Sequence, residues 1–442
     1  MKNTLSIFAL TFAAALCFGA SALLAGDGAM SDPTGSPLVE WIFSQIPEEP
    51  LFGDNLCDAD APEGVWSMAS DGEFGANEDK AIWTSEKIGS FDCTFEFKMS
   101  PHANAGFLFS CTDKDNWIPN TIEIQLLEDY GCQPDYHSCA SFYGYQAPTK
   151  NASKKANQWN KMRIQRVGCW VKVWLNDELV NTINTAAWTD REKSPAGTDI
   201  EEKFHGHSLA SAEPYGFIGL QGLHHGEPVR YRNAVIKKVK NFAPDTAKSG
   251  WGLLFGEDLS NADCDKNVWS IKDGMLISNK DDAVWSKDKY ENFVLDFDFV
   301  CALTANSGIV IKASDKANWI PNALEVQIED TADKPCSFTS CGAIYGKTPV
   351  LYNSMNKADQ WNHMSIACQG DWIFVILNGE LVTLMDKGLY TDKVINADGS
   401  ETKPWLRERA PADLENNGWI GIQGLHNGEA PAFYKNVKIL GL

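Results

Sequence analysis

The stretch DKDNWIPNTIEIQL at residues 113–126 returns as DKANWIPNALEVQI at residues 315–328, 202 residues further along the chain. Shorter landmarks keep the same offset, such as QWN at 158–160 and 360–362. A repeat period this long indicates duplicated domains rather than a solenoid, whose units are much shorter. The chain of 442 residues is also longer than one hydrophobic core usually organises. We therefore expect two tandem copies of one domain of about 200 residues.

Each copy contains short runs in which apolar and polar residues alternate, a pattern that is typical of half-buried strands. Residues 91–97 (FDCTFEF) and 293–299 (FVLDFDF) show this alternation. The apolar runs 170–175 and 372–377 end in Asn-Asp and Asn-Gly, and Asn-Gly is a strong hairpin signal. Long amphipathic helices are missing from the pattern. We predict an all-β protein made of two tandem jelly-roll β-sandwiches.

The amino terminus has the features of a secretory signal peptide. Lys2 precedes an apolar run from Leu5 to Leu24, and the small residues at 20–22 suit signal peptidase. A membrane anchor is the alternative, but polar residues break the run and no basic stop-transfer flank follows it. We expect a secreted or periplasmic protein without a membrane span. The predicted divisions are a signal peptide at 1–22, a flexible leader at 23–36, a first domain at 37–241, a linker at 242–250 and a second domain at 251–442.

The charge and the aromatic content limit the classes of partner. The formal net charge of −21 argues against nucleic acid, because binding a phosphate backbone requires clustered Lys and Arg. The 16 Trp residues favour aromatic-lined surfaces. A carbohydrate ligand or substrate is the predicted partner, and the oligomeric state stays open.

One predicted strand carries the first candidate site residues. Side chains alternate across a strand, so Glu123 and Gln125 share one face while aliphatic residues take the other. An ordinary solvated face is the simplest explanation of such a strand. However, Gln221 lies on a similarly patterned strand that leads directly to His224. We predict one sheet face bearing Glu, two Gln and His, which suits a glycan-binding or catalytic cleft. The second copy repeats the set as Glu325, Gln327, Gln423 and His426.

Three further residue types recur beside these strands. The Asn residues fall in an Asn-x-Gly turn, where Asn either tolerates positive φ or contacts a ligand. The Tyr residues, each followed by Gly, either stack on a sugar or pack. The Trp residues lie in a predicted loop, where an aromatic ring is more useful to a carbohydrate than to a core. These candidate substrate-binding residues are Asn104 and Asn306, Tyr143 and Tyr345, and Trp117 and Trp319. No role is assigned to the histidines that lack a match in the second copy, which are His102, His137, His205 and His207.

The cysteines suggest two local disulfides, since export makes disulfides plausible. Cys139 and Cys341 stand at matching positions, and each has another cysteine just upstream. We predict disulfides Cys132–Cys139 and Cys336–Cys341, each tightening one loop. A metal site explains them less well, because no cysteine pair comes with a second CxxC or a His pair.

At these residues the chain resembles the 3-keto-disaccharide hydrolase family, also described as 3-keto-glycoside lyases and hydratases. The order of the motifs over each whole copy carries the resemblance. It implies a jelly roll of the concanavalin A-like lectin/glucanase type, related to laminin-G domains. It also makes Arg232 and Lys435, in the closing motif, candidate substrate-binding residues. The motifs are LFGEDL at 254–259, NSGI at 306–309, EVQI at 325–328, YG at 345–346, WN at 361–362, LNG at 377–379, IGLQGLH at 218–224, IGIQGLH at 420–426, YRN at 231–233 and YKN at 434–436.

The chain departs from the family pattern in three places. Gly-Leu lengthens the turn before the family histidine, so either His224 or His225 could match it in the first copy. An Arg commonly found after the NSGI strand is absent, and Cys111 and Lys312 stand near those positions. Lys435 replaces the closing Arg.

The resemblance implies cleavage of glycosidic bonds in 3-keto-glycosides and 3-keto-disaccharides. The ketone acidifies the C2 proton, so a base can remove it; the enolate then expels the C1 substituent, and water addition completes net hydrolysis. The Glu and His residues are the candidate bases and acids, and the amides would hold hydroxyls or the oxyanion. The cofactor is unknown, with a divalent metal ion on the Glu and His as an alternative stabiliser of the enolate. The rival functions are a non-catalytic carbohydrate-binding module and a laminin-G-like interaction domain, because fold alone does not fix function.

Overall fold

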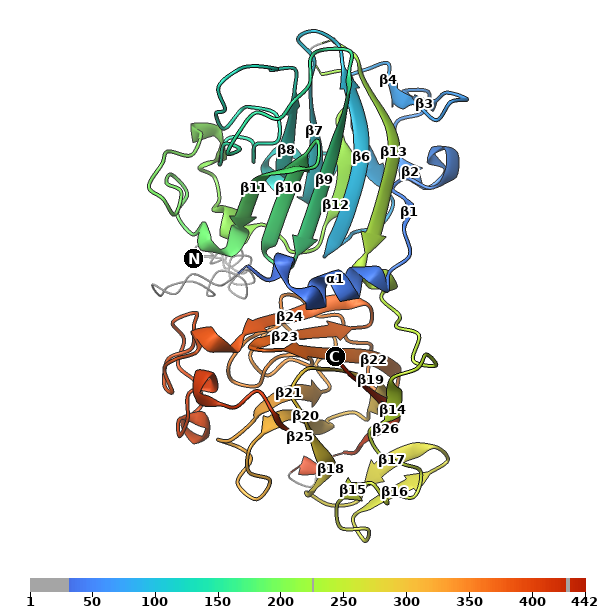
Figure 1. The fold of residues 1–442 in the computed structure, drawn as a ribbon, viewed down its shortest axis with the longest axis vertical. Helices are drawn as coiled ribbons and strands as arrows, with labels where there is room; N and C mark the ends of the chain where they lie inside the picture. Colours follow the sequence, from blue (N-terminus) through green and yellow to red (C-terminus); the bar gives the residue numbers. More distant parts are fainter. Residues whose placement is uncertain (1–31, 225, 427–429) are drawn as a thin grey trace, which may run out of the picture.

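The chain folds into two β-sandwiches, seen one above the other in the computed structural model of Figure 1. The structure describes residues 32–224, 226–426 and 430–442, so the predicted signal peptide and most of the predicted leader lie outside the described residues. Each sandwich pairs an eight-stranded sheet with a five-stranded sheet, and the strand order is the same in both copies. The predicted all-β fold of two tandem jelly-roll sandwiches is confirmed.

The first domain contains β1 to β13. Its eight-stranded sheet has the order β11-β10-β9-β6-β13-β4-β3, with β1 also pairing with β13, and its five-stranded sheet has the order β2-β5-β12-β7-β8. The strands are β1 (Glu49–Pro50), β2 (Ala59–Asp60), β3 (Trp66–Met68), β4 (Phe74–Ala76), β5 (Ile82–Thr84), β6 (Phe91–Met99), β7 (Asn104–Cys111), β8 (Ile122–Leu127), β9 (Trp159–Val167), β10 (Trp170–Leu175), β11 (Glu178–Asn184), β12 (Phe217–Leu220) and β13 (Val229–Lys238).

The second domain repeats this order with β14 to β26. Its sheets run β16-β17-β26-β19-β22-β23-β24, with β14 on β26, and β15-β18-β25-β20-β21. The strands are β14 (Trp251–Leu253), β15 (Ala262–Asp263), β16 (Trp269–Lys272), β17 (Met275–Ser278), β18 (Ala283–Tyr290), β19 (Phe293–Cys301), β20 (Asn306–Ala313), β21 (Leu324–Glu329), β22 (Trp361–Gln369), β23 (Trp372–Leu377), β24 (Glu380–Asp386), β25 (Gly418–Gln423) and β26 (Ala432–Gly441).

Helical structure is confined to short pieces. In the described part of the chain, α1 (Pro37–Ser44) is the one α-helix, and Ser36 is its N-cap, whose side chain accepts from the Val39 amide. The last residues of the predicted leader form a 3₁₀ helix just before it. The 3₁₀ helices are η1 (Pro33–Gly35), η2 (Asp54–Leu56), η3 (Ile118–Asn120), η4 (Thr185–Ala187), η5 (Glu202–Phe204), η6 (Leu209–Ser211), η7 (Val239–Asn241), η8 (Lys387–Leu389), η9 (Pro404–Leu406) and η10 (Pro411–Asp413). No helix of the described residues is both long and apolar enough to cross a membrane.

The core of each domain lies between its two sheets, as the alternating pattern predicts. Along β6 the odd-numbered residues from Phe91 to Met99 are buried, and the residues between them are half-buried. In β8, Ile122, Ile124 and Leu126 enter the same core. Because side chains alternate along a strand, Glu123 and Gln125 point to the opposite face of the five-stranded sheet.

Helix α1 packs between the two domains (Figure 1). Its apolar residues belong to one buried cluster that takes Val167 and Val239 from the first domain and Phe374 and Leu384 from the second. The backbone amide of Leu38 also donates to Gln369 Oε1 at 3.0 Å, across 331 residues of chain. The helix therefore packs against both halves, in a cluster separate from the two sandwich cores, although the sequence pattern assigns it to the first domain alone.

The predicted linker begins inside this interface. Phe242 is 4% exposed, and its ring meets the ring of Trp41 edge-on, with the centroids 5.9 Å apart. Further out, Tyr215 of the first domain stacks on Tyr352 of the second, with centroids 5.3 Å apart. The two sandwiches are joined by packed side chains as well as by the chain itself.

Each sandwich has a buried cation at its end, but the two cations lie on strands that do not match between the domains. In the first domain Arg166 of β9 donates to Ser110 Oγ at 2.8 Å and to the carbonyl of Gly168 at 3.1 Å. In the second domain Lys312 of β20 donates to the carbonyl of Gly370 at 3.0 Å. Burial lowers the pKa of Arg166 to about 10 and also lowers the pKa of Lys312.

These cations explain one departure from the family pattern. The residue 202 positions before Lys312 is Ser110, which is not a cation. Arg166 of β9 donates a hydrogen bond to Ser110, so its guanidinium group lies beside the position that Lys312 occupies in the second domain. At the position matching Arg166 the second domain has Cys368. The cation that is missing from β7 is therefore supplied by β9.

Candidate functional site

A pocket of about 230 Å³ lies on the face of the first domain's five-stranded sheet that points away from the core. It brings together predicted site residues from β7, β8, the segment after β12 and the loops between. Seven of the lining residues were predicted from sequence: Asn104, Trp117, Glu123, Gln125, Tyr143, Gln221 and His224. The other five are Ile118, Thr121, Tyr145, Lys203 and Phe204.

Glu123 lies against Gly106 of the neighbouring strand β7. A Cβ at position 106 would lie 2.8 Å from Glu123 Cγ and closer still to Oε1, so only glycine leaves room for this carboxylate. The Asn-x-Gly segment starts β7 and does not form the predicted turn, so the glycine is needed for space. Burial raises the pKa of Glu123 to about 7, and the charge of Lys203 opposes that rise. A carboxyl group that titrates near neutral pH can act as a base or as an acid.

Amide side chains line the pocket beside this carboxylate. With its amide nitrogen turned toward the carboxylate, Gln125 donates to Glu123 Oε1 at 3.2 Å and to the carbonyl of Ala105 at 3.0 Å. Gln221 is 7% exposed, and its Oε1 has no hydrogen-bond partner among the residues that the structure describes. A buried acceptor in a pocket lining is satisfied by a donor from a ligand or from water.

His224 is held at the pocket by an acidic residue that the sequence pattern did not reveal. Its Nδ1 lies 2.9 Å from Asp79 Oδ2, a contact that orients the ring. The second domain repeats the pair, with His426 Nδ1 3.2 Å from Asp281 Oδ2. Because Asp79 and Asp281 keep the 202-residue offset, the duplication itself contained the signal that would have found them.

Lys203 and Phe204 are the other lining residues that the sequence did not suggest. Both lie in or beside η5, within the long loop between β11 and β12. Lys203 Nζ donates to Tyr143 Oη at 2.9 Å. The matching positions in the second domain are Trp405 and Leu406, so no repeated motif could have pointed to Lys203.

The second domain keeps the carboxylate of the site. A Cβ at Gly308 would lie 2.7 Å from Glu325 Cγ, so the same glycine device is present. Burial raises the pKa of Glu325 to about 8. Gln327 donates to Asn306 Oδ1 at 3.2 Å and to Glu329 Oε2 at 3.0 Å instead of contacting the catalytic candidate.

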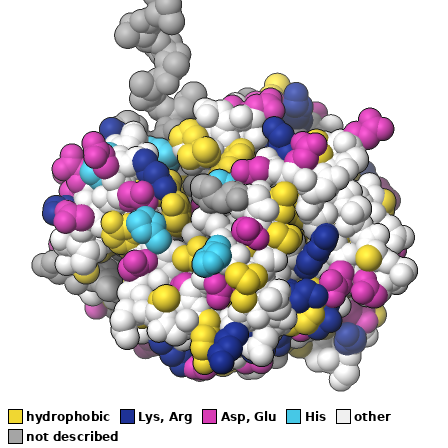
Figure 2. All heavy atoms as spheres, turned by 90° about the horizontal axis from the view of Figure 1, so that it is seen from above, with side chains coloured by type: hydrophobic (Ala, Val, Ile, Leu, Met, Phe, Trp, Pro, Cys, Tyr) yellow, Lys and Arg dark blue, Asp and Glu magenta, His cyan; other side chains and the backbone are white. Residues whose placement is uncertain are grey.

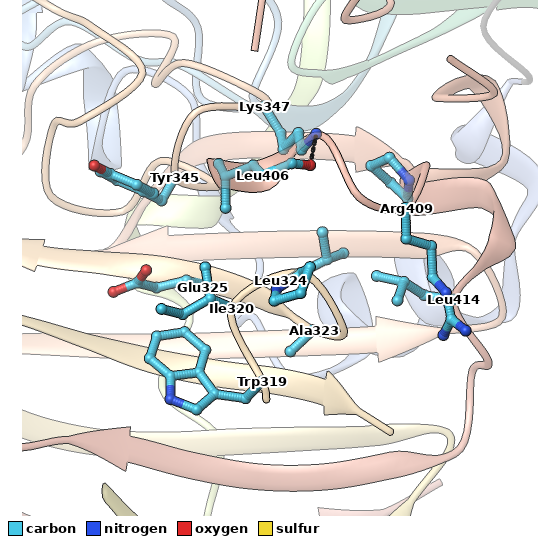
Figure 3. A pocket seen from close by; sticks show the side chains of 12 residues that line it. Trp319, Ile320, Ala323, Leu324, Glu325, Tyr345, Lys347, Leu406, Arg409 and Leu414 are labelled. Carbon is cyan, nitrogen blue, oxygen red and sulfur yellow. Dashed lines mark hydrogen bonds between the residues drawn. The ribbon is translucent and has the colours of Figure 1, made fainter. Parts of the chain in front are cut away.

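The hollow around Glu325 has a different lining (Figure 3). Among the described residues, the pocket that contains Trp319, Glu325 and Tyr345 has a volume of about 20 Å³, which is room for about one water. Lys347 also lines it, where the first domain has Tyr145, and its Nζ lies 3.5 Å from the carbonyl of Leu406. Gln423 and His426 contact each other at 3.1 Å, outside this lining.

Arg232 and Lys435 lie elsewhere, so their predicted role in substrate binding is not supported by their position. Both belong to the eight-stranded sheets, on β13 and β26. Arg232 pairs with Glu96 at 2.6 Å and lies 4.1 Å from the centre of the Trp159 ring. Lys435 lies 3.7 Å from the centre of the Trp361 ring. Each closing motif directs its cation away from the core, onto a tryptophan.

The predicted disulfides Cys132–Cys139 and Cys336–Cys341 are wrong in this structure, since all described cysteines are free thiols. Cys139 is buried in the core, whereas Cys132 is exposed. Hydrogen bonds hold this loop in their place: Asp129 Oδ2 accepts from the Cys139 amide at 2.9 Å, and Asn151 Nδ2 donates to the Asp129 carbonyl at 2.7 Å. In the second domain, Thr331 Oγ1 accepts from the Cys341 amide at 2.9 Å.

The residues around Glu123 do not fit a metal ion. Nowhere in the described ranges do three or more His, Cys, Asp or Glu side chains gather closely enough to hold one. The neighbours of the carboxylate are instead amides, aromatic rings and one ammonium group.

The view onto the end of the first domain shows Lys and Arg side chains interspersed with Asp and Glu, and no single basic patch dominates that face (Figure 2).

Comparisons with known proteins agree with the repeat. A family model described as a 3-keto-alpha-glucoside-1,2-lyase-like domain matches residues 49–237 and again residues 250–440. One similar solved structure is a candidate glycosyl hydrolase from Parabacteroides distasonis, 42% identical, with a TM-score of 0.42, covering 43% of this chain and 99% of that one. A second candidate glycosyl hydrolase from the same organism is 19% identical, with a TM-score of 0.36, covering 45% and 97%. A carbohydrate-binding module from Bacillus subtilis is 14% identical, with a TM-score of 0.26, covering 43% and 94%. The search of curated proteins found no match.

Proposed function

Because the chain belongs to the 3-keto-alpha-glucoside-1,2-lyase-like family, we propose that its first domain cleaves the glycosidic bonds of 3-keto-glycosides and 3-keto-disaccharides. The family makes the chain a carbohydrate-active protein of a glycosyl hydrolase-like kind. The observation that carries the particular reaction is Glu123, a pocket carboxylate whose pKa is raised to about 7 by burial. Such a group is ionised in a useful fraction at neutral pH and still basic enough to take a proton from carbon next to a ketone.

The reaction begins at C2 of the 3-keto sugar. The Glu123 carboxylate takes the C2 proton, and the electrons of that C–H bond form a C2–C3 double bond while the ketone oxygen becomes an enolate oxygen. The enolate re-forms the ketone, a C1–C2 double bond appears, and the C1–oxygen bond breaks. The leaving oxygen takes a proton, and addition of water across C1–C2 then gives the free 3-keto sugar. This route avoids an oxocarbenium ion.

The other pocket residues have parts that follow from their contacts. His224, oriented by Asp79, is the proposed acid for the leaving oxygen, because an imidazole nitrogen is a common proton donor in catalysis. The unpartnered Oε1 of Gln221 is suited to accept from a sugar hydroxyl. Trp117 offers a ring on which a sugar can stack.

The test is release of the aglycone from an aryl 3-keto-glucoside by the purified full chain. The matched control substrate is the same aryl glucoside without the ketone. We expect turnover of the keto compound alone, because only the ketone acidifies the C2 proton. Cleavage of both substrates at similar rates would mean an ordinary glycosidase, and cleavage of neither would contradict the proposal.

A saccharide-binding role is the second candidate, and one observation favours it for the second domain. Ile320, in the lining of the small pocket around Glu325, is 46% exposed, and Trp405, next to the lining residue Leu406, is 55% exposed. An exposed indole ring of this kind binds sugars by stacking without cleaving them. Titration of a 3-keto-glucoside into W405A, followed by calorimetry, should then show one weakened binding event and unchanged turnover.

We also propose that the protein is exported, on the basis of residues 1–22. The mass of the mature chain, recovered from the extracellular or periplasmic fraction, tests this. A mature chain that still begins at Met1 would contradict it.

A further inference from the structure

The long loop between β11 and β12 reaches the pocket by docking on one Tyr-Gly pair. The Glu201 amide donates to the Gly144 carbonyl at 2.9 Å. Gly144 has a φ of +76°, and a Cβ there would lie 2.5 Å from Phe204 Cδ2. Only glycine therefore allows the loop to dock directly beside Tyr143. This docking sets the position of Lys203.

Lys203 is held by several groups at once. Its Nζ donates to Tyr143 Oη at 2.9 Å and lies 4.1 Å from the centre of the Tyr143 ring. The same ammonium pairs with Glu201 Oε1 at 3.2 Å. Glu201 Oε2 in turn lies 3.2 Å from His137 Nε2. A side chain fixed by such contacts is oriented before any ligand arrives.

The contact with Tyr143 has a chemical consequence. An ammonium group can only donate, so the Tyr143 oxygen uses a lone pair toward Lys203 and keeps its own proton for another acceptor. Both residues line the pocket that contains Glu123. Among the described lining residues, Lys203 is the only Lys or Arg. It therefore supplies the fixed positive charge on this side of the pocket.

The proposed reaction needs such a donor, since proton abstraction by Glu123 places negative charge on the former ketone oxygen. Resting on the function proposed above, we propose that Lys203 is a positioning residue that directs the Tyr143 hydroxyl group toward the enolate oxygen formed in the first domain. The positive charge of Lys203 lies on the other side of the Tyr143 oxygen from the enolate. The Tyr143 O–H donates to the enolate without transferring its proton. The enolate electrons then return to C3–O as the C1–oxygen bond breaks. In the second domain Trp405 stands at the position that matches Lys203.

The experiment compares four variants of the full chain, with the aryl 3-keto-glucoside as substrate. K203Q removes the charge, K203R retains it, and Y143F removes the hydroxyl. K193Q is the matched control, because it breaks an exposed ion pair with Asp199 on the same loop and touches no pocket residue. Each variant is assayed for kcat, for KM and for exchange of the C2 proton in deuterated water, which reports enolate formation without needing bond cleavage.

We expect K203Q and Y143F each to lower kcat by about 100-fold, with little change in KM, because the contact is made to charge that develops only in the transition state. C2 exchange should fall in parallel. K203R should retain most of the activity, and K193Q all of it. Equal losses in K203Q and K203R, or wild-type kcat in K203Q, would overturn the proposal.

A pH profile separates positioning from a merely structural role. The positive charge of Lys203 opposes the rise in the pKa of Glu123 that burial causes, so K203Q should move the rising limb of the kcat/KM profile to higher pH while K203R leaves it in place. The other titratable groups facing Glu123 are His224, Tyr143 and Tyr145 in the pocket lining, and Tyr231 behind the sheet. An unmoved limb in K203Q would contradict the assignment. A wild-type chain without turnover would reject the proposed function itself, whereas an active wild type with an unaffected K203Q would reject only the role of Lys203.

Discussion

The two domains share a scaffold but place different partners around the same carboxylate. In both, a glutamate lies against a glycine on the adjacent strand, and burial raises its pKa. The loop that leaves the edge strand of the eight-stranded sheet then delivers Lys203 in one domain and Trp405 in the other. The alternate residues of each strand must fit a closed core, which fixes the direction of the side chains between them, whereas a loop docked at a few points is free to change. The comparison shows that the carboxylate belongs to the scaffold, while its electrostatic partner belongs to the loop.

Removing each carboxylate separately tests whether the two sites differ in activity. We expect E123Q to lower turnover of the aryl 3-keto-glucoside by about 1000-fold, as for loss of a general base. E325Q should leave turnover within about twofold of wild type, because Trp405 replaces Lys203 there and the Lys347 ammonium contacts the Leu406 carbonyl instead of a tyrosine hydroxyl. Steady-state kinetics on the two single variants decide the matter. Equal losses in both would mean that the second site is the equal of the first.

The buried cations offer a comparison in stability. R166A leaves a cavity and strips Ser110 and the Gly168 carbonyl of their donor at the end of the first sandwich. We therefore expect its free energy of unfolding to fall by about 3–4 kcal/mol. K312A should cause a similar loss in the second domain. Urea denaturation followed by tryptophan fluorescence measures both.

An exchange variant tests whether the two buried cations are equivalent. S110K combined with R166C gives the first domain the arrangement of the second, with the cation on β7, and should recover part of the stability lost in R166A. If the double variant were no more stable than R166A, the two cations would not be equivalent.

The smallest expected effect concerns pH. Glu123 and Glu325 have folded-state pKa values of about 7 and about 8, both above the usual 4.5. Over the interval between the usual value and the folded value, the native state binds more protons than the unfolded state, so stability falls as pH rises. We expect a loss of about 1–3 kcal/mol from Glu123 between pH 4.5 and about 7, and a loss from Glu325 that continues to about pH 8.

Urea titrations across this range, on wild type and on each Gln variant, measure these losses. E123Q should flatten the lower part of the profile, and E325Q should flatten it up to the higher limit. An unchanged slope in either variant would mean that ionisation of the corresponding carboxylate does not lower the free energy of unfolding.

Much of the fold could be predicted from the sequence because its signals are local and doubled. The alternation in β8 is by itself enough to put Glu123 and Gln125 on one face, and the repeat supplies a second instance of each motif. The role of α1 could not be predicted, because its partners, such as Gln369, lie far along the chain, 331 residues away in that case. The position of Arg232 was also hidden, since alternation gives the face of a strand but not the sheet that it joins.

The candidate site was predictable only where the two copies agree. Asn104, Gln221 and His224 have counterparts at fixed spacing, and they line the pocket. Lys203 has none, and a single lysine in a loop that differs between the copies carries no pattern. The cysteine prediction was wrong for a related reason: proximity along the chain does not reveal that one thiol lies in the core while the other faces solvent.

The packing of α1 between the two domains has a practical consequence for anyone who expresses the domains separately. A cut at the apparent boundary near residue 250 would leave Phe374 and Leu384 without their cover on one fragment, and the helix without its far wall on the other. Freshly uncovered apolar surface of this kind drives self-association. Thermal unfolding of one domain should accordingly cause the other to unfold as well. Each fragment should be produced only together with the α1 segment.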